Sequence, residues 1–518
     1  MKRRALLAAI AGLGFAGALV AAFAPGAHDL WSRAATGLEA PDDGYWSAPT
    51  RRLAGAGDQD AYDHDLAVAL ALPQNALAAT AVALGVPYPH ARFAGSLLAA
   101  AVLAGLVGLA VSGRARVAGG VGLAFLATPP VLGHLVSDLG EGTALGFTAL
   151  WAVAALGRRW FLAGLLAAVA LSQKASGLAL GLGTLVGVLG SAQRRVDLPR
   201  AALGVAAGLA SAVAIAVFVF QDAPLAFLTR PYLATADTQS GTKGVAVVVQ
   251  AAFLGHHGVG RWLLPGFGAA LVAAVFAGPR RPSVAVVAAT AAACLFAGAF
   301  PDPWRVLPAL PLLAATLVDT APPPGAGTRG PARATRGSVA PALLALPQAV
   351  GGAAAWVGPS SALVLLGLCA AAAAMLVVLR RYGPRPRWAL AITVIATATG
   401  LASSGWVVSR RTDERRDLAR EVASRVPREA PLIGYSFLAS AYRGTLYYPP
   451  FHLLWAREVA ARPPPALYRL RVLTSEEEAP PPGPAGYAVV ERVALGDRLY
   501  NREEFRRPLV LETLRPSR

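Results

Sequence analysis

Charged side chains are scarce in this chain. Only 15% of its 518 residues are Asp, Glu, Lys or Arg, whereas 55% are hydrophobic. Soluble domains carry about 25% charged residues. A soluble chain of this length would divide into several domains, and so few charges could not supply each of them with a polar surface. The apolar content equally excludes a disordered chain. The composition therefore indicates an integral membrane protein.

Cysteine is also nearly absent. The two cysteines, Cys294 and Cys369, lie in apolar runs far from any second metal-ligating side chain. This spacing argues against a disulfide framework and against a cysteine zinc site.

Long apolar runs recur along the chain. A membrane-spanning helix needs about 20 mostly apolar residues, and the runs predict thirteen spans. The run 160–191 is too long for one span, and the polar stretch Ser172–Ser176 in its middle predicts a tight hairpin of two short helices. The predicted spans are 6–23, 93–112, 117–136, 140–157, two within 160–191, 201–220, 262–279, 282–299, 306–319, 339–356, 361–379 and 388–408.

Basic residues gather at every second connection between these spans. Short cytoplasmic loops collect Lys and Arg, so the pattern fits thirteen spans with a cytoplasmic N-terminus. The seven clusters hold 19 of the 47 basic residues, and the only acids in or near them are Asp197 and Asp319. Because the basic residues are dispersed over short loops, no continuous nucleic-acid-binding face is expected. The clusters are 2–4, 114–116, 158–159, 194–200, 280–281, 329–336 and 380–387.

The chain divides into two predicted domains. Residues 1–408 form an all-α polytopic membrane domain, with an acidic outer loop at 25–92 and a Pro- and Gly-rich cytoplasmic linker at 320–338. Residues 409–518 contain no spanning run and are expected to form a small α/β domain, which the odd number of spans places outside the cytoplasm. Its predicted helices are 411–426 and 453–461, and its predicted strands are 431–435 and 486–490. A cell (plasma or inner) membrane location follows.

The outer loop 25–92 carries the clearest candidate chemistry. Adjacent carboxylates, Asp42 and Asp43, follow a proline just beyond the first span and precede Tyr45 and Trp46. A carboxylate there could act as a general base toward an acceptor hydroxyl at the membrane surface. Alternatively, Asp42 caps the start of a helix.

The order of motifs in this loop resembles the GT-C glycosyltransferases, in the branch of the protein O-mannosyltransferases and the lipid A aminoarabinose transferase. That branch has an acidic pair followed by Gly-Tyr-Trp or Ala-Tyr, then a Gly-Asp segment with further acids, an apolar helix and an aromatic-Ser/Ala-Ala-Arg segment. This chain has Asp43 where the branch usually has Glu. The matching segments here are 42–46, 57–58, 63–65, 66–86 and 90–93.

Two later segments extend the resemblance to about residue 320. Leu171–Gly177 is similar to the family's Leu-Thr-Lys-Gly/Pro hairpin between two short helices. Phe300–Pro311 is similar to an aromatic-Arg-Tyr-Leu-Leu-Pro segment at the start of a late span.

The resemblance implies a sugar transfer from a polyprenyl-phosphate-linked monosaccharide to a cell-envelope hydroxyl (of a lipid, glycan or protein) on the extracytoplasmic side, with inversion. Asp42 or Asp43 would remove the acceptor proton. Lys174 and Arg305 would hold the departing phosphate. Alternatively, these two side chains only extend their charged ends to the membrane interface. No acidic partner for Lys174 is evident in the sequence, and such an intramembrane lysine is a functional candidate.

Other acids in the region have less defined roles. Asp63 and Asp65, with Tyr45, are expected to position substrate; a divalent cation is possible there, but no metal site is assigned because many relatives need none. Glu141 opens the fourth span and either faces a substrate cavity or stabilises the helix start.

Three alternatives remain open at this point. A transporter or flippase of a lipid-linked sugar would more often show internal repeats and charges within several spans. A non-catalytic scaffold that binds a cell-envelope partner through residues 409–518 would tolerate the loss of Asp42 and Asp43. An O-antigen-ligase-like enzyme is a further possibility, although that class relies on a late outer loop.

Overall fold

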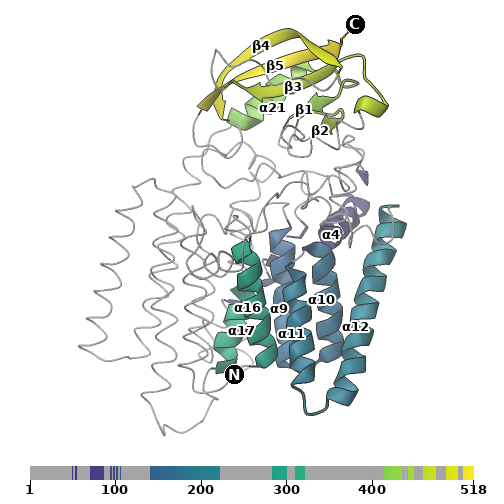
Figure 1. Ribbon diagram of the computed structural model, residues 1–518, viewed down its shortest axis with the longest axis vertical. Coiled ribbons are helices and arrows are strands. Elements are labelled where there is room, and N and C mark those ends of the chain that lie inside the picture. The colour runs from purple at the N-terminus through teal and green to yellow at the C-terminus, as the bar shows by residue number, and fades with distance from the viewer. Residues whose placement is uncertain are drawn as a thin grey trace, which may run out of the picture.

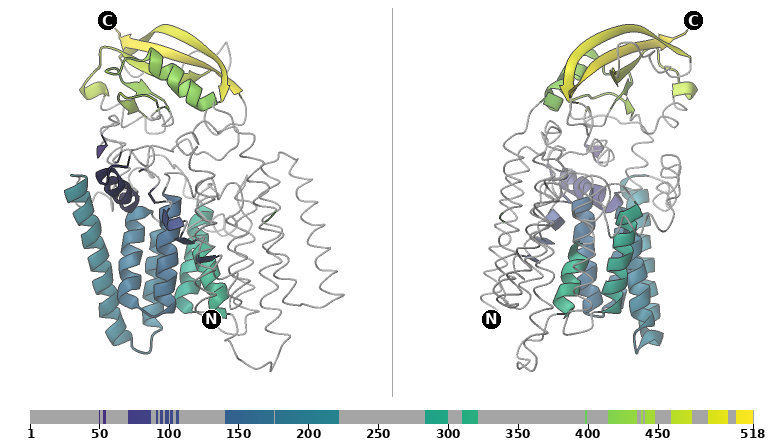
Figure 2. Two further views of the ribbon diagram at one scale, coloured as in Figure 1. Left: turned by 180° about the vertical axis from the view of Figure 1, so that it is seen from behind. Right: turned by 60° about the vertical axis from the view of Figure 1, so that its left-hand side comes forward.

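The computed structural model contains a bundle of helices and, beyond one end of it, a five-stranded sheet (Figure 1). The short helix α4 lies at the same end of the bundle as the sheet (Figures 1 and 2). The residues that the structure describes are 71–86, 140–174, 176–221, 283–299, 310–320, 414–434, 441–447, 459–473, 486–499 and 506–517, with isolated positions near 50–54, 91–106, 398 and 438.

Helices α9, α10, α11 and α12 alternate in direction. Short turns join α9 to α10, α10 to α11 and α11 to α12, and α10 packs against both α9 and α12. The N-terminus of α9 and the C-terminus of α10 therefore meet at one end of the bundle, and the arginines at 158–159 and 194–195 lie at the other. The helices are α4 (Leu72–Ala83), α9 (Glu141–Leu156), α10 (Trp160–Gln173), α11 (Gly177–Leu189), α12 (Arg194–Ala214, continued by a π-helical turn η2, Ile215–Val219), α16 (Val284–Ala299) and α17 (Leu310–Thr320).

Several predicted helix positions agree with this part of the structure. Helices α9 and α16 coincide closely with the predicted spans 140–157 and 282–299. The predicted break within 160–191 is confirmed, because α10 ends at Gln173 and α11 begins at Gly177.

The start of α12 differs from the prediction. The helix begins at Arg194 instead of residue 201, so the basic cluster 194–200 forms helical turns and is not a connecting loop. Arginine is a good helix former, and the search for apolar runs could not detect these turns.

One described helix, the 26-residue segment Arg194–Val219, is long and apolar enough to cross a membrane, and four shorter apolar helices accompany it. The thirteen-span architecture stays a prediction, because most of the remaining runs lie outside the described residues.

Helices α10 and α12 pack through small residues. A Cβ atom on Gly204 would lie 2.0 Å from the carbonyl oxygen of Phe161, and one on Gly164 would lie 2.3 Å from that of Ala201. Large apolar side chains, among them Leu185, Leu203 and Phe218, are exposed. Close helix contacts at small residues are typical of membrane helices.

The C-terminal residues form an α/β unit. Strand order in the sheet is β2-β1-β3-β5-β4; β1 is parallel to β2 and β3, and β5 is antiparallel to β3 and β4. The predicted helix at 411–426 and strands at 431–435 and 486–490 match α21, β1 and β4, while β2, β3 and β5 were not predicted. Only the end of the predicted helix 453–461 is described. The elements are α21 (Glu414–Arg425), β1 (Leu432–Ile433), β2 (Leu446–Tyr447), β3 (Leu467–Val472), β4 (Tyr487–Leu499) and β5 (Arg506–Pro516).

The sheet has one apolar and one partly charged face. Leu470 and Leu511 belong to a core that includes Leu418 of α21. Because neighbouring residues of a strand point to opposite faces, Glu512 lies on the other side. There its carboxylate is fully buried and sits 2.6 Å from Nη2 of Arg469, 3.2 Å from Nε of Arg492 and 3.4 Å from Nε of Arg471.

Candidate functional site

A buried ion pair joins two of the residues singled out in the sequence. Nζ of Lys174 lies 3.4 Å from Oε1 of Glu141, and the two side chains are only 9% and 3% exposed. Lys174 therefore has an acidic partner that was not evident in the sequence. The sequence did not reveal the pair because the two residues belong to different helices that only folding brings together.

The electrostatic potentials at the ends of two helices stabilise the charges of this pair. Lys174 directly follows the last residue of α10, where helix carbonyl groups make the potential negative, and Glu141 is the first residue of α9, where amide groups make it positive. The carboxylate of Glu141 therefore lies at a helix start and contacts a cation. That it faces a substrate cavity stays a prediction.

A buried amide network surrounds the ion pair. The backbone N–H of Gln74 donates to Oε1 of Gln173 at 3.0 Å, and Nε2 of Gln173 donates to the carbonyl oxygen of Gly140 at 3.2 Å. The hydroxyl of Thr143 donates to Oε1 of Gln74 at 3.4 Å. These bonds tie α4, α9 and α10 together beside Lys174.

Gly140 is needed at the centre of this network. Its φ angle is +86°, a conformation that glycine adopts without strain. A Cβ atom at this position would lie 2.4 Å from Nε2 of Gln173 and 3.0 Å from Oε1 of Gln74. Only glycine lets the carbonyl of residue 140 approach Gln173 so closely.

Two described residues of the predicted outer loop, Thr50 and Ala71, lie at the junction where α4, α9 and α10 meet. The hydroxyl of Thr50 donates to Oδ1 of Asn75 at 2.8 Å, and Ala71 is fully buried at the start of α4.

Most predicted site residues are not described by the structure. Of the eight candidates, the structure brings together Glu141 and Lys174. The other six, Asp42, Asp43, Tyr45, Asp63, Asp65 and Arg305, lie outside the described residues. Gln74, Gly140 and Gln173 were missed. The polar pair Gln74-Asn75 inside an apolar segment, and the Gly140-Glu141 step before an apolar helix, were the available signals.

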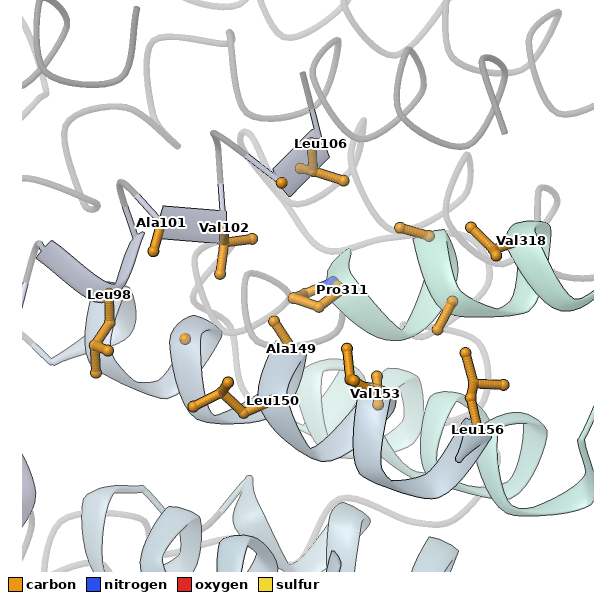
Figure 3. Close-up of a pocket in the computed structure, with 15 residues that line it drawn as sticks. Leu98, Ala101, Val102, Leu106, Ala149, Leu150, Val153, Leu156, Pro311 and Val318 are labelled. Atoms are coloured by element: carbon orange, nitrogen blue, oxygen red, sulfur yellow. The ribbon is translucent and has the colours of Figure 1, made fainter. Parts of the chain in front are cut away.

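An apolar groove of about 480 Å³ runs between α9, α17 and residues 98–106 (Figure 3). Its floor on α9 is a stripe of side chains at helical spacing that includes Leu150, Val153 and Leu156. Pro311 and Val318 of α17 face this stripe (Figure 3). The lining is suited to a hydrocarbon chain and offers no site for a polar ligand.

Within the described ranges, no group of three or more His, Cys, Asp or Glu side chains is arranged to hold a metal ion. No family model, curated protein or solved structure gives a significant match to this chain.

Proposed function

We propose that this protein is a membrane glycosyltransferase that moves a sugar from a polyprenyl-phosphate-linked monosaccharide to a hydroxyl of a cell-envelope acceptor. The observation that carries the proposal is the buried Lys174–Glu141 pair, at the junction where α4 of the acidic loop meets α9 and α10. A cation beside a loop rich in carboxylates supplies the two chemical functions that the reaction needs.

In the proposed reaction, Asp42 or Asp43 removes the proton of the acceptor hydroxyl. The acceptor oxygen then forms a bond to the anomeric carbon, on the face opposite the phosphate. The bond from that carbon to the phosphate oxygen breaks, and the electron pair leaves with the phosphate. Lys174 and Arg305 stabilise this leaving group, while Tyr45, Asp63 and Asp65 orient the sugar and the acceptor.

The pair with Glu141 gives Lys174 a defined state before the donor binds. A buried ammonium without a counter-charge is costly, and the carboxylate at 3.4 Å offsets that cost. The donor phosphate competes with Glu141 for the same cation. No resident metal ion is required in this scheme.

The organisation of the bundle supports a membrane location. Large apolar side chains such as Val153 and Phe218 are exposed, and α10 and α12 approach each other through glycines. The arginines at 158–159 lie at the end opposite the ion pair, which suits a cytoplasmic end and an extracytoplasmic site. The groove beside α9 would accept the polyprenyl chain of the donor.

The test is sugar release from a panel of polyprenyl-phosphate monosaccharides in membranes that contain the protein. Asp42→Asn and Asp43→Asn are compared with Asp29→Asn, which changes an acid of the same loop outside the motif, at matched abundance. We expect one of the first two substitutions to abolish release and the control to retain it. The proposal would be overturned if no donor released sugar, or if neither Asp42→Asn nor Asp43→Asn reduced the release.

The alternatives give different results in the same membranes. A flippase would move the labelled donor between leaflets of a vesicle without releasing sugar. A scaffold would neither move nor cleave it. For the enzyme, Lys174→Ala is expected to weaken donor binding, and unchanged binding would remove Lys174 from the site.

A further inference from the structure

The N-terminus of α4 is capped by a side chain from a distant helix. The residue at the N-cap position of α4, Ala71, has no side-chain group that can accept a hydrogen bond, and Pro73 has no N–H group. The N–H of Gln74 has no acceptor within α4 itself, because the first backbone donors of any helix lack one. Oε1 of Gln173, at the end of α10, accepts this hydrogen bond at 3.0 Å.

The other end of the Gln173 amide fixes the start of α9. Nε2 donates to the carbonyl oxygen of Gly140 at 3.2 Å, and Gly140 immediately precedes Glu141. Gln173 itself immediately precedes Lys174 and is fully buried. A single amide therefore links the acidic loop, the carboxylate of the ion pair and the cation of the ion pair.

We propose that Gln173 is a positioning residue, which holds α4 in a fixed relation to the Lys174–Glu141 pair. The two hydrogen bonds by which Gln173 joins Gln74 to Gly140 are called the Gln173 clamp. The clamp does not depend on any activity, whereas its role in catalysis rests on the proposed function. Glutamine is suited to the task because its amide accepts on one side and donates on the other. Glutamate could accept from Gln74 but could not donate to Gly140.

The clamp is tested first by a distance measurement. Spin labels are placed on Leu84 after α4 and on Leu178 of α11, both of which are exposed, after Cys294 and Cys369 are replaced by serine. We expect a narrow distance distribution in the unsubstituted protein and a broad or shifted one in Gln173→Leu. Gln193→Leu, which changes an exposed glutamine at the start of α12, is the matched control and should leave the distribution narrow.

A distribution that Gln173→Leu leaves unchanged would overturn the proposal. If this variant does not accumulate, Gln173→Glu serves in its place. It retains the acceptor for Gln74 and is expected to keep the distribution narrow, so a broad distribution for this variant would equally count against the clamp as described.

The catalytic meaning is tested by separating kcat from KM. Gln173→Leu releases the N-terminus of α4 beside the Lys174–Glu141 pair, so we expect kcat to fall by about tenfold or more, the effect of misplacing groups that must act together. Gln173→Glu keeps α4 in place but adds a negative charge beside Lys174. We expect it to raise KM for the anionic donor with a smaller change in kcat.

If Gln173 acted only in folding, the variants would be less abundant, but kcat would not fall in Gln173→Leu while KM rises in Gln173→Glu. Equal kinetic effects in both variants would overturn the positioning role. If the unsubstituted protein acts on no donor, the proposed function fails, and the distance measurement still decides whether Gln173 clamps α4.

Discussion

Lys174 and Glu141 neutralise each other across the junction of α9 and α10, where the potentials of both helix ends favour them. Removing one partner of a buried pair deprives the other of this counter-charge, a loss of up to about 3–5 kcal/mol. Lys174→Met or Glu141→Gln alone should therefore lower the free energy of unfolding by about this amount. The double variant should be clearly more stable than the sum of the single effects predicts.

Chemical unfolding of the purified protein measures these free energies as a double-mutant cycle. The exposed pair between Arg420 and Asp417 of α21 is the control, because an exposed ion pair contributes at most about 1 kcal/mol. Additive effects at Lys174 and Glu141 would contradict a coupled pair.

Local sequence patterns predicted the break at 172–176 because a short polar segment interrupted an apolar run that was too long for one helix. They could not predict that Gln173 caps α4 or that Lys174 meets Glu141. Those contacts depend on how α9 and α10 are placed in space, and neither residue lies in a motif that identifies its partner.

The C-terminal sheet shows the same limit. The apolar residues of 431–435 and 486–490 indicated strands. Strand β3 was not predicted, because Arg469 and Arg471 interrupt its apolar pattern. Their charges are compensated by Glu512 on β5, a partner that becomes visible only when the strands are paired. The candidate site is only partly defined by the structure, because Asp42, Asp43 and Arg305 lie outside the described residues.

Gly140→Ala should lower the stability of the protein by more than the backbone strain of a left-handed residue. Gly85 has almost the same backbone angle, φ +85°, but an added Cβ atom there meets nothing within 4 Å. Gly85→Ala should therefore lose only the strain of a left-handed residue, about 1–2 kcal/mol. Gly140→Ala also displaces Gln173, so its loss in thermal or chemical stability should be distinctly larger. Equal losses would show that the contact with Gln173 is unimportant.

Gly204→Ala should separate α10 from α12, because the new methyl group would lie 2.0 Å from the carbonyl oxygen of Phe161. Backbone atoms cannot yield as a flexible side chain would. Gly181→Ala on α11 adds the same group where nothing lies within 4 Å, and it should be neutral or slightly stabilising. Thermal unfolding of the two variants gives the comparison, and similar melting temperatures would contradict close packing at Gly204.

Glu512→Gln should destabilise the C-terminal sheet. It removes the carboxylate that Arg469, Arg471 and Arg492 share, and the loss of a counter-charge is expensive for largely buried side chains such as Arg471. Glu491→Gln is the control, because Glu491 is exposed on β4. Hydrogen exchange of the β3 and β5 amides should increase in the first variant and stay the same in the second. Unchanged exchange in Glu512→Gln would mean that the arginines are adequately solvated without it.

Tyr442 should make the stability of the C-terminal α/β unit depend on alkaline pH. Its hydroxyl donates to the carbonyl oxygens of Pro427 and Ala430, and burial, with smaller effects of Glu429 and Tyr468, raises its pKa well above the usual range.

Because the folded pKa of Tyr442 is raised, the folded state retains the proton more strongly than the unfolded chain. The resulting stability is fully present below the unfolded pKa of about 10 and is lost as the pH rises through the folded value. The melting temperature, measured from about pH 8 upward, should fall above about pH 10, and Tyr442→Phe should remove much of that slope while it lowers stability at neutral pH. The same alkaline slope in both proteins would assign it to other groups and would show that the buried hydroxyl titrates normally.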